Sequence, residues 1–444
     1  MELKDARVLV VGMAKSGLAA AGLLAGRGAR VSACDLRPAE ELPEAAAELA
    51  ARGVPFFRQT PELFEGQDLI VISPGVPADL AELERARSAG VPVVGELELA
   101  SWFLQGETIG ITGSNGKTTT TAMTGHILRQ CGIPCQVGGN IGTPPTSLVA
   151  SSRPGVWNVL ELSSFQLETI RSFRPRVAVV TNITPDHLDR HRTFEAYRAA
   201  KARILENQTA EDCAVLNASD PECVGFGALA RGRVFWFSQD KPVSPGVWFD
   251  GQSIRAGDQL ILDARHFPLK GRHNIENAMA AAAASLLAGA RPEAIGAALA
   301  SFPGVEHRLE FVRTVRGVSY YNDSKATNVD ATLKAVDAFD GGLWVILGGK
   351  DKNSDYRPLR RPLRSKARAA LLIGKAAPII AAHLEGAVPL LPCGDLATAV
   401  RTAYQSAAAG DVVLLAPACA SFDQFQSFEH RGRAFKALVM DLEE

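Results

Sequence analysis

The segment Gly110-Ile-Thr-Gly-Ser-Asn-Gly-Lys-Thr-Thr-Thr-Thr121 carries the strongest fold signal in this chain. Its apolar approach, glycine-rich turn and helix beginning near Lys117 predict the strand, loop and helix order of a phosphate-binding loop. In such a loop, backbone N–H groups and a helix N-terminus surround an anion, the lysine adds charge, and a hydroxyl such as Thr118 can bind Mg²⁺. Ile111 replaces the first glycine of the usual pattern, which indicates a variant loop. A plain glycine-rich turn with a surface lysine is disfavoured, and we predict binding of ATP or GTP.

Composition predicts a cytoplasmic globular protein with about three domains. The chain has 444 residues, of which 47% are hydrophobic and 21% charged, as is usual for proteins with well-packed cores. A net charge of -1 argues against nucleic acid or an anionic membrane as the main partner. We expect no signal peptide and no membrane-spanning segment. Seven cysteines without a C-x-x-C pair indicate reduced thiols and no structural zinc.

Residues 6–35 predict the opening strand, helix and strand of a dinucleotide-binding type of domain. A buried strand ends at Gly12, and Asp35 follows the second strand, about where a ribose would lie. Ala14 replaces the middle glycine of G-x-G-x-x-G, so an ordinary α/β turn remains an alternative. Ser73 to Gly75 follow another strand and should face the same crevice. A nucleotide-like ligand is therefore expected in a first domain at 1–95.

Polar side chains end two strands of the second domain. Glu161 ends one strand, Asn182, Asp186 and His187 follow another, and Asn140 lies in the glycine loop Gly138–Gly142. Carboxylate and imidazole groups converging on one sheet edge near a phosphate loop are reasonable ligands for Mg²⁺. His187 alone would more often be a structural histidine, so convergence carries the prediction.

Three other features of this domain leave alternatives open. From spacing alone, Lys201 on the helix 194–206 is a surface lysine. Asn274 and Asn277 begin an alanine-rich helix, where their amides can cap the helix or contact a base; capping is the favoured role. Short strand-like pieces in 231–269 predict a small β subdomain or meander.

A Pro/Gly hinge near residue 303 separates the second and third domains. Beyond it, strands alternate with helices, which predicts another parallel, doubly wound sheet. The predicted fold class is therefore α/β with three domains: a Rossmann-like domain at 1–95, a central phosphate-loop ATPase domain with a mainly parallel sheet at 96–303, and a Rossmann-like C-terminal domain at 304–444.

Taken together, several segments in this order resemble the Mur ligase family. They are Thr112-Gly-Ser-Asn-Gly-Lys-Thr-Thr119, Glu161-Leu-Ser-Ser-Phe-Gln-Leu-Glu168, Asp186-His187, His273-Asn274 with Asn277, His307-Arg308 and Asn322-Asp-Ser-Lys-Ala-Thr-Asn328. The D-glutamate-adding branch of the family is resembled by Ser73-Pro-Gly75, Gly138-Gly-Asn-Ile-Gly142 and Pro417-Ala-Cys-Ala-Ser-Phe-Asp-Gln-Phe-Gln-Ser-Phe428-Glu-His-Arg-Gly432. The resemblance covers essentially the whole chain.

The resemblance implies an ATP-dependent amide ligase of peptidoglycan precursor synthesis. ATP phosphorylates the terminal carboxylate of UDP-N-acetylmuramoyl-L-alanine, and the D-glutamate amine attacks the acyl phosphate. A tetrahedral intermediate then collapses to the amide and phosphate, leaving ADP. A sister ligase of the L-alanine-adding, diamino-acid-adding or folylpolyglutamate type remains an alternative, as does a nucleotide-binding sensor or scaffold without catalysis.

The resemblance also implies the roles of individual residues. The expected catalytic residues are Lys117, Glu161, His187 and Lys201. Thr118 and Glu161 would hold one Mg²⁺ and His187 a second, with Lys201 as a carbamate ligand. ATP would be bound by Gly113, Asn115, Gly116, Lys117, Thr118, Thr119, Asn277, Arg308 and Asp323. The UDP substrate would be bound by Lys15 and Ser16 at the pyrophosphate, Arg37 at the uracil, Asn140 at the muramoyl arm, and Asp35, Ser73, Gly75 and Ser163. D-Glutamate would be bound by Thr327, Lys352, Ser421 and Phe428.

Two positions depart from the family pattern. Leu36 stands where a hydroxyl is expected beside the uracil, and Lys350-Asp-Lys352 carries an extra positive charge. Either Lys350 or Lys352 can therefore be the glutamate ligand. We further expect a monomer whose third domain closes over ATP by a hinge at Ser301 to Val305.

Overall fold

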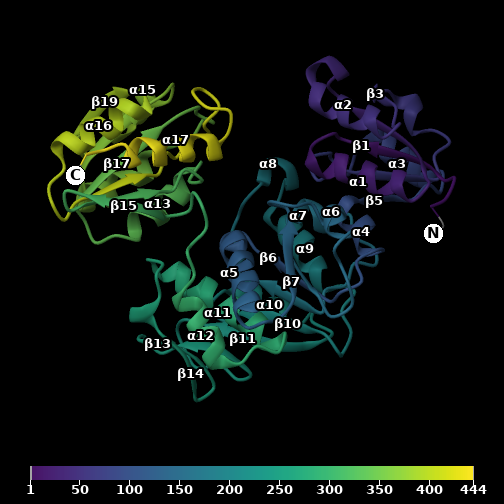
Figure 1. Ribbon diagram of the computed structural model, residues 1–444, viewed down its shortest axis with the longest axis horizontal. Coiled ribbons are helices and arrows are strands. Elements are labelled where there is room, and N and C mark those ends of the chain that lie inside the picture. Colours follow the sequence, from purple (N-terminus) through teal and green to yellow (C-terminus); the bar gives the residue numbers. More distant parts are fainter. Residues whose placement is uncertain (1–2, 444) are drawn as a thin grey trace. The chain divides into compact units, whose positions relative to one another are not determined.

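The protein, described for residues 3–443 by a computed structural model, divides into two compact units. One unit comprises Met1–His266 with Ile275–Phe302, and the other comprises Phe267–Asn274 with Pro303–Glu444. The first unit contains two sheets and the second contains one (Figure 1). No helix in residues 3–443 is long and apolar enough to cross a membrane.

The first sheet is a five-stranded parallel sheet in the order β3-β2-β1-β4-β5. Its strands are β1 (Arg7–Val11), β2 (Arg30–Asp35), β3 (Phe56–Arg58), β4 (Leu69–Ile72) and β5 (Val93–Gly95). Helices accompany it in Figure 1: α1 (Lys15–Gly26), α2 (Pro43–Ala51) and α3 (Ala81–Ser88). All of β4 is buried, as expected for a central parallel strand covered on both faces. Its strand order matches the predicted Rossmann-like arrangement.

The second sheet has nine strands in the order β14-β13-β12-β11-β10-β9-β6-β8-β7. They are β6 (Thr108–Thr112), β7 (Cys135–Gly139), β8 (Trp157–Glu161), β9 (Val177–Val180), β10 (Cys213–Asn217), β11 (Arg233–Ser238), β12 (Gly246–Phe249), β13 (Ser253–Ala256) and β14 (Gln259–Asp263). Strands β6 to β12 pair in parallel, and β12 to β14 are antiparallel. Of the two alternatives expected for 231–269, the meander is found, because β12, β13 and β14 pair antiparallel in sequence order. These strands do not form a subdomain of their own, since β11 pairs with β10 and continues the central sheet.

Helices of the central region join and cover these strands. They are α4 (Glu96–Ser101), α5 (Lys117–Gln130), α6 (Pro145–Leu148), α7 (Ser164–Leu167), α8 (Leu188–His191), α9 (Phe194–Ala202), α10 (Pro221–Phe226), α11 (Arg272–Leu287) and α12 (Pro292–Ala300). The consecutive alanines of 280–284 are fully buried in α11. Small side chains let this helix pack at close range within its unit.

The sheet of the second unit has the order β15-β16-β20-β17-β18-β19 and is parallel except for β15. Its strands are β15 (Glu310–Val315), β16 (Val318–Asn322), β17 (Leu343–Gly348), β18 (Ala367–Ile373), β19 (Leu390–Gly394) and β20 (Val412–Leu415). Its helices are α13 (Val329–Asp337), α14 (Arg360–Lys366), α15 (Ala377–Leu384), α16 (Leu396–Ser406) and α17 (Phe428–Met440). Side chains of β17 alternate between two cores: Val345 joins one, Ile346 the other. The predicted three-domain α/β class is confirmed.

Candidate active site

The glycine-rich loop between β6 and α5 is shaped for an anion. Gly113 has φ 142° and Gly116 has φ 83°, both in the region that favours glycine. Helix α5 begins at Lys117, so its first N–H groups face the loop. A Cβ at Gly116 would overlap the amide of Asn277 from α11. The structure thus brings Asn277, an expected ATP ligand, beside the loop.

Two lysine ammonium groups share one carbonyl of this loop. Lys117 Nζ donates to Gly113 O at 2.9 Å, and Lys201 Nζ donates to the same oxygen at 2.7 Å. Lys201 is only 2% exposed, so the surface reading of this residue is wrong. Burial, followed by the nearby charge of Lys117, lowers the pKa of the Lys201 amine well below its ordinary value. Spacing along one helix could not show that α9 faces the phosphate loop.

Glu161 is held at the end of β8 by the glycine loop of β7. Asn140 N donates to Glu161 O at 2.8 Å, and Asn140 Nδ2 donates to Glu161 Oε1 at 3.3 Å. A Cβ at Gly139, which has φ 117°, would overlap the Glu161 backbone. Glu161 is 2% exposed, and its Oε2 has no hydrogen-bond partner within residues 3–443. An unpartnered buried carboxylate oxygen marks a place suited to a cation.

Asn182 supports the phosphate loop from β9. Its Oδ1 accepts from Asn115 N at 2.9 Å, and its Nδ2 donates to Asn115 O at 3.2 Å. Thr181 Oγ1 donates to the same Asn115 oxygen at 2.6 Å. The side-chain amide of Asn182, which was expected at this strand end, therefore orients the backbone of the phosphate loop.

His187 lies on the turn before α8 and is half-exposed. Its φ of 51° is unusual for a residue with a side chain. The ring contacts the edge of Phe165, with ring centroids 5.1 Å apart. The buried end of the site thus gathers Lys117, Lys201 and Glu161, whereas His187 faces outward.

The crevice of the first sheet is formed by loops that bond to one another. Ser73 Oγ donates to Gly12 O at 2.7 Å, and a Cβ at Gly17 would overlap that carbonyl. Asp35 accepts from Met13 N at 2.8 Å and from Arg37 N at 3.0 Å. Its carboxylate therefore fixes the two turns that carry the expected UDP ligands. Leu36, where a hydroxyl was expected, is 73% exposed.

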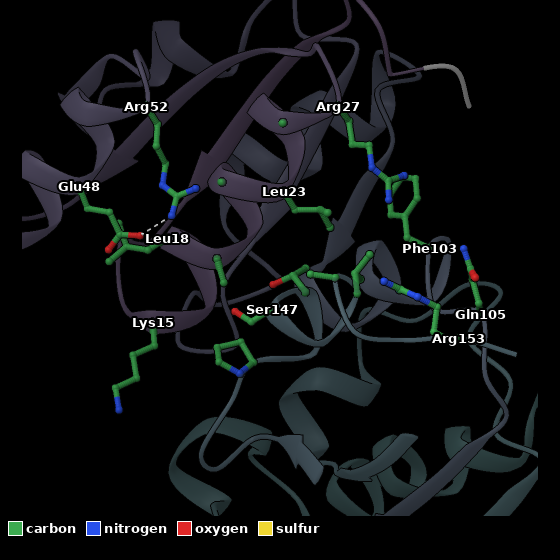
Figure 2. A pocket seen from close by; sticks show the side chains of 17 residues that line it. Lys15, Leu18, Leu23, Arg27, Glu48, Arg52, Phe103, Gln105, Ser147 and Arg153 are labelled. Carbon is green, nitrogen blue, oxygen red and sulfur yellow. Dashed lines mark hydrogen bonds and ion pairs between the residues drawn. The ribbon is translucent and has the colours of Figure 1, made fainter. Parts of the chain in front are cut away.

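Lys15 lies at the start of α1 and lines a cavity of about 770 Å³. Figure 2 shows Arg52 beside Glu48 on one wall and Arg27 stacked on Phe103 on another. Ser147 and Arg153 complete the wall from the central region. Lys15 thus lines a cavity whose walls carry several basic side chains.

Ser163 caps α7 rather than standing free. Its Oγ accepts from Gln166 N at 3.3 Å, and Gln166 Oε1 accepts from Ser163 N at 3.0 Å. This capping box fixes the helix two residues after Glu161. The backbone N–H and hydroxyl of Ser163, an expected ligand of the UDP substrate, therefore both bond within the helix end.

In the second unit, Arg431 on α17 connects two loops. It is 1% exposed, donates to Ser324 Oγ at 3.0 Å and Ser324 O at 2.8 Å, and donates to Cys419 O at 3.1 Å. Burial lowers its pKa to about 10. No sequence motif assigns a role to Arg431. Its only signal was its place three residues after Phe428.

The expected ligands on those two loops differ in exposure. Asp323 is 8% exposed, and burial raises its pKa to about 6. Ser421 is buried, Thr327 and Phe428 are half-buried, and Lys350 and Lys352 are exposed. Lys350 N donates to Ala420 O at 2.8 Å, which joins the loop after β17 to the loop after β20. Both lysines thus remain available for the same carboxylate.

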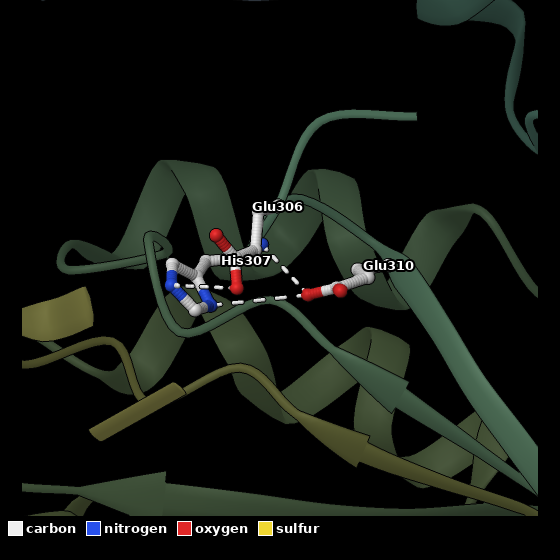
Figure 3. A group of neighbouring side chains, drawn as sticks. All are labelled: Glu306, His307 and Glu310. Carbon is white, nitrogen blue, oxygen red and sulfur yellow. Dashed lines mark hydrogen bonds and ion pairs between the residues drawn. The ribbon is translucent and has the colours of Figure 1, made fainter. Parts of the chain in front are cut away.

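Glu306, His307 and Glu310 form a cluster with the composition of a metal site (Figure 3). Lys436 Nζ donates to Glu306 Oε1 at 3.0 Å and to Glu310 Oε1 at 2.6 Å. Asn322 Nδ2 lies 2.9 Å from His307 Nδ1 and donates to Glu310 Oε2. A lysine ammonium therefore already provides the positive charge between these carboxylates. The cluster orients the turn that precedes Arg308.

Comparisons with known proteins match all three regions of the chain. Residues 6–95 match the Mur ligase MurD-like N-terminal domain, 111–285 the Mur ligase middle domain, and 307–419 the Mur ligase glutamate ligase domain. UDP-N-acetylmuramoylalanine–D-glutamate ligase of Solibacter usitatus is 61% identical, with 100% of this chain and 99% of that protein covered. The ligase of the same name from Acidobacterium capsulatum is 53% identical, with 99% and 97% covered.

A solved structure supports the fold. UDP-N-acetylmuramate-alanine ligase MurC from Thermotoga maritima aligns with a TM-score of 0.62 at 20% identity, covering 98% of this chain and 99% of that one. At this identity the likeness concerns the architecture alone.

Proposed function

The chain belongs to the Mur ligase family, and from that premise we propose that it is an ATP-dependent ligase that joins D-glutamate to UDP-N-acetylmuramoyl-L-alanine. The full-length relatives named for this reaction support the assignment. The observation that carries it is the phosphate loop, where Lys117 and the buried Lys201 converge on one carbonyl. The charge of Lys117 and the first N–H groups of α5 suit a site that neutralises phosphates during phosphoryl transfer.

The first step activates a carboxylate that is otherwise a poor acyl donor. The substrate carboxylate attacks the γ-phosphorus of ATP, the bond to the bridging oxygen breaks, and ADP leaves. Lys117 and the N–H groups at the start of α5 would stabilise the charge on the transferred phosphoryl group. Asn277, beside Gly116, would contact the nucleotide from α11.

Mg²⁺ fits the donor set at the end of β8. Glu161 offers a buried oxygen without a partner in the described part of the chain, and Thr118 follows Lys117 at the first turn of α5. We propose Thr118 and Glu161 as ligands of one ion, and His187 and carbamylated Lys201 as further metal ligands. When bound, the ions would neutralise charge on the transferred phosphoryl group.

Lys201 has the properties that carbamylation needs. Burial lowers the pKa of its amine, which favours the neutral, nucleophilic form that reacts with CO₂, and burial also shields the product from water. The amine nitrogen forms a bond to the carbon of CO₂, and one proton leaves to solvent. A cation thereby becomes a carboxylate-like metal ligand.

The second step forms the amide. The D-glutamate amine attacks the acyl phosphate, and the tetrahedral intermediate expels inorganic phosphate. We propose that Thr327, Ser421, Phe428 and either Lys350 or Lys352 bind D-glutamate. Arg308 and Asp323 are proposed to bind the phosphate and ribose of ATP.

The UDP substrate is assigned to the first sheet and its neighbours. Lys15 and Ser16 would bind the pyrophosphate, Arg37 the uracil and Asn140 the muramoyl arm. Asp35, Ser73, Gly75 and Ser163 complete the set, with Asp35 acting through the turns it fixes. We also propose a cytoplasmic monomer without a nucleic-acid partner.

Phosphate release from ATP in the presence of UDP-N-acetylmuramoyl-L-alanine tests this function. D-Glutamate, L-glutamate, L-alanine and no amino acid are compared, and the product is weighed by mass spectrometry. Release with D-glutamate alone, with a product heavier by one glutamyl residue, is expected. Release with another amino acid would assign the chain to a sister ligase, and no release would leave a nucleotide-binding protein.

A further inference from the structure

Helices α7 and α8 are joined by a buried histidine that the reaction described above does not use. His191 Nε2 lies 2.9 Å from Ser164 Oγ, and His191 Nδ1 lies 3.1 Å from Glu168 Oε1. The residue is 7% exposed. We call Ser164, Glu168 and His191 the α7–α8 clasp.

An aromatic ring of α7 also contacts side chains of α8 and of the turn before it. The Phe165 ring of α7 contacts two imidazoles four residues apart. His191 stacks on it with ring centroids 5.3 Å apart, and His187 meets it in a T-shaped contact at 5.1 Å. The guanidinium of Arg190 lies 4.2 Å from the same ring centroid. These contacts to one ring hold α8 and the turn before it against α7.

The order serine, histidine and acid is also that of a hydrolase triad. Ser164 is 2% exposed and its hydroxyl is covered by the packing of α7, so no substrate carbonyl can approach it. His191 also contacts the edge of the Tyr197 ring at 5.3 Å, and Tyr197 Oη lies 2.9 Å from Ser114 Oγ of the phosphate loop. This arrangement serves to hold elements together.

The α7–α8 clasp connects the segments that carry two proposed metal ligands, Glu161 and His187. Glu161 ends β8 and is followed at once by the capping box that starts α7. His187 is the N-cap residue that precedes α8, and His191 N donates to His187 O at 3.0 Å. Fixing His191 to α7 therefore fixes the backbone of His187 relative to Glu161.

We propose that His191 is a positioning residue that holds His187, a proposed ligand of the second metal ion, in place relative to Glu161, a proposed ligand of the first. The proposal rests on the proposed roles of Glu161 and His187 as metal ligands. Loss of groups that orient a ligand typically weakens metal affinity by about 10- to 100-fold. The Mg²⁺ site is therefore sensitive to a residue that never touches the ion.

Binding of Mn²⁺ as a probe tests the clasp directly. Free Mn²⁺ is measured by electron paramagnetic resonance with full-length protein, a non-hydrolysable ATP analogue and UDP-N-acetylmuramoyl-L-alanine. His191→Phe keeps the stacked ring and removes both nitrogens, and we expect about 10-fold weaker Mn²⁺ binding. The KM for D-glutamate at saturating Mg²⁺ should stay unchanged, which a general loss of structure would not allow.

Three further variants complete the design. His266→Phe, at an exposed histidine outside the clasp, should bind Mn²⁺ like the parent protein. The double variant Ser164→Ala/His191→Phe should bind Mn²⁺ no more weakly than His191→Phe alone, because the two groups act through one contact. Glu168→Gln removes one charge at a partly exposed side chain and should weaken Mn²⁺ binding in the same direction even if His191→Phe folds poorly.

The reference variant His187→Ala separates the two proposals. If His187→Ala weakens Mn²⁺ binding and His191→Phe and Glu168→Gln do not, the clasp proposal is wrong and the metal-ligand assignment stands. If His187→Ala binds Mn²⁺ like the parent, the His187 assignment is wrong and the clasp proposal falls with it. Ligase activity is judged separately by phosphate release.

Discussion

The phosphate loop of the first unit and the loops of the second unit that carry the proposed D-glutamate ligands are built in contrasting ways. At the phosphate loop Glu161 and Lys201 are each 2% exposed, and Lys117 is half-buried. In the second unit, Lys350 and Lys352 are exposed, and the buried Arg431 braces the loops. The first region thus has buried charged groups at its centre, whereas the lysines proposed to bind D-glutamate are exposed to solvent.

This difference follows from the chemistry each region is proposed to perform. Phosphoryl transfer gains most from fixed charges in a site with little water, because their effect on developing charge is then strongest. A free amino acid must instead be captured from solution, which exposed ammonium groups on braced loops can do. Burial in the first region and bracing in the second therefore serve different steps.

Replacing Lys117 should lower activity more than any other change described here. Lys117→Met removes the loop's own cation, and we expect kcat to fall by about 1000-fold. Phosphate release at saturating substrates measures this. Lys241→Met, at an exposed lysine of the same unit, is the control and should keep full activity.

Replacing Arg431 tests the bracing of the second region. Arg431→Met leaves the carbonyls of Ser324 and Cys419 buried without their donor, and we expect about 3 kcal/mol less stability in urea unfolding. The KM for D-glutamate should rise as the loops loosen. Arg433→Met, at an exposed neighbour on α17, should change neither value; equal effects at both positions would refute the bracing role.

The buried carboxyl group of Asp323 should make the stability of the protein depend on pH. Burial raises its folded pKa to about 6, above the usual value of about 3.9 for an unfolded aspartate. The protonated form thus favours folding below about pH 4, and this stability is lost as pH rises through 6. Asp323→Asn should therefore be more stable than the parent by about 3 kcal/mol at pH 8, and most of this difference should be lost by pH 4. The free energy of unfolding in urea is measured for both proteins at pH 4 and pH 8. The same difference between the two proteins at both pH values would contradict this prediction.

The smallest expected effect concerns the shape of the phosphate loop. In Gly116→Ala the added methyl group would be strained by the backbone φ of 83° and would overlap the Asn277 amide. We therefore expect ATP to bind about 10-fold more weakly. Gly132→Ala has a similar φ of 71° but open space around it, so it isolates the backbone strain. Calorimetric titration with an ATP analogue should show the loss only for Gly116→Ala.

Local patterns predicted much of the fold and part of the site. The phosphate loop, the strand ends at Glu161 and the order of strands and helices follow from glycine spacing and apolar runs, which are short-range signals. Lys201 was placed at the surface from its own helix, because burial depends on α9 packing against a loop far away in sequence. The short strands near residue 240 likewise needed a partner strand, β10, to place them.

Residues that act through others were the least visible in the sequence. His191 and Arg431 orient neighbouring elements, and no motif distinguishes such histidines and arginines from ordinary surface residues. The boundaries at residues 95 and 303, the choice between Lys350 and Lys352, and the modification of Lys201 stay predictions.

The most direct test of the account follows the oxygen atoms of the substrate carboxylate. UDP-N-acetylmuramoyl-L-alanine labelled with ¹⁸O in that carboxylate is incubated with ATP and D-glutamate, and the released phosphate is analysed by mass spectrometry. Activation as an acyl phosphate predicts one ¹⁸O atom in each phosphate formed with the amide product. Unlabelled phosphate would contradict the account, because ATP would then be hydrolysed without activating the substrate.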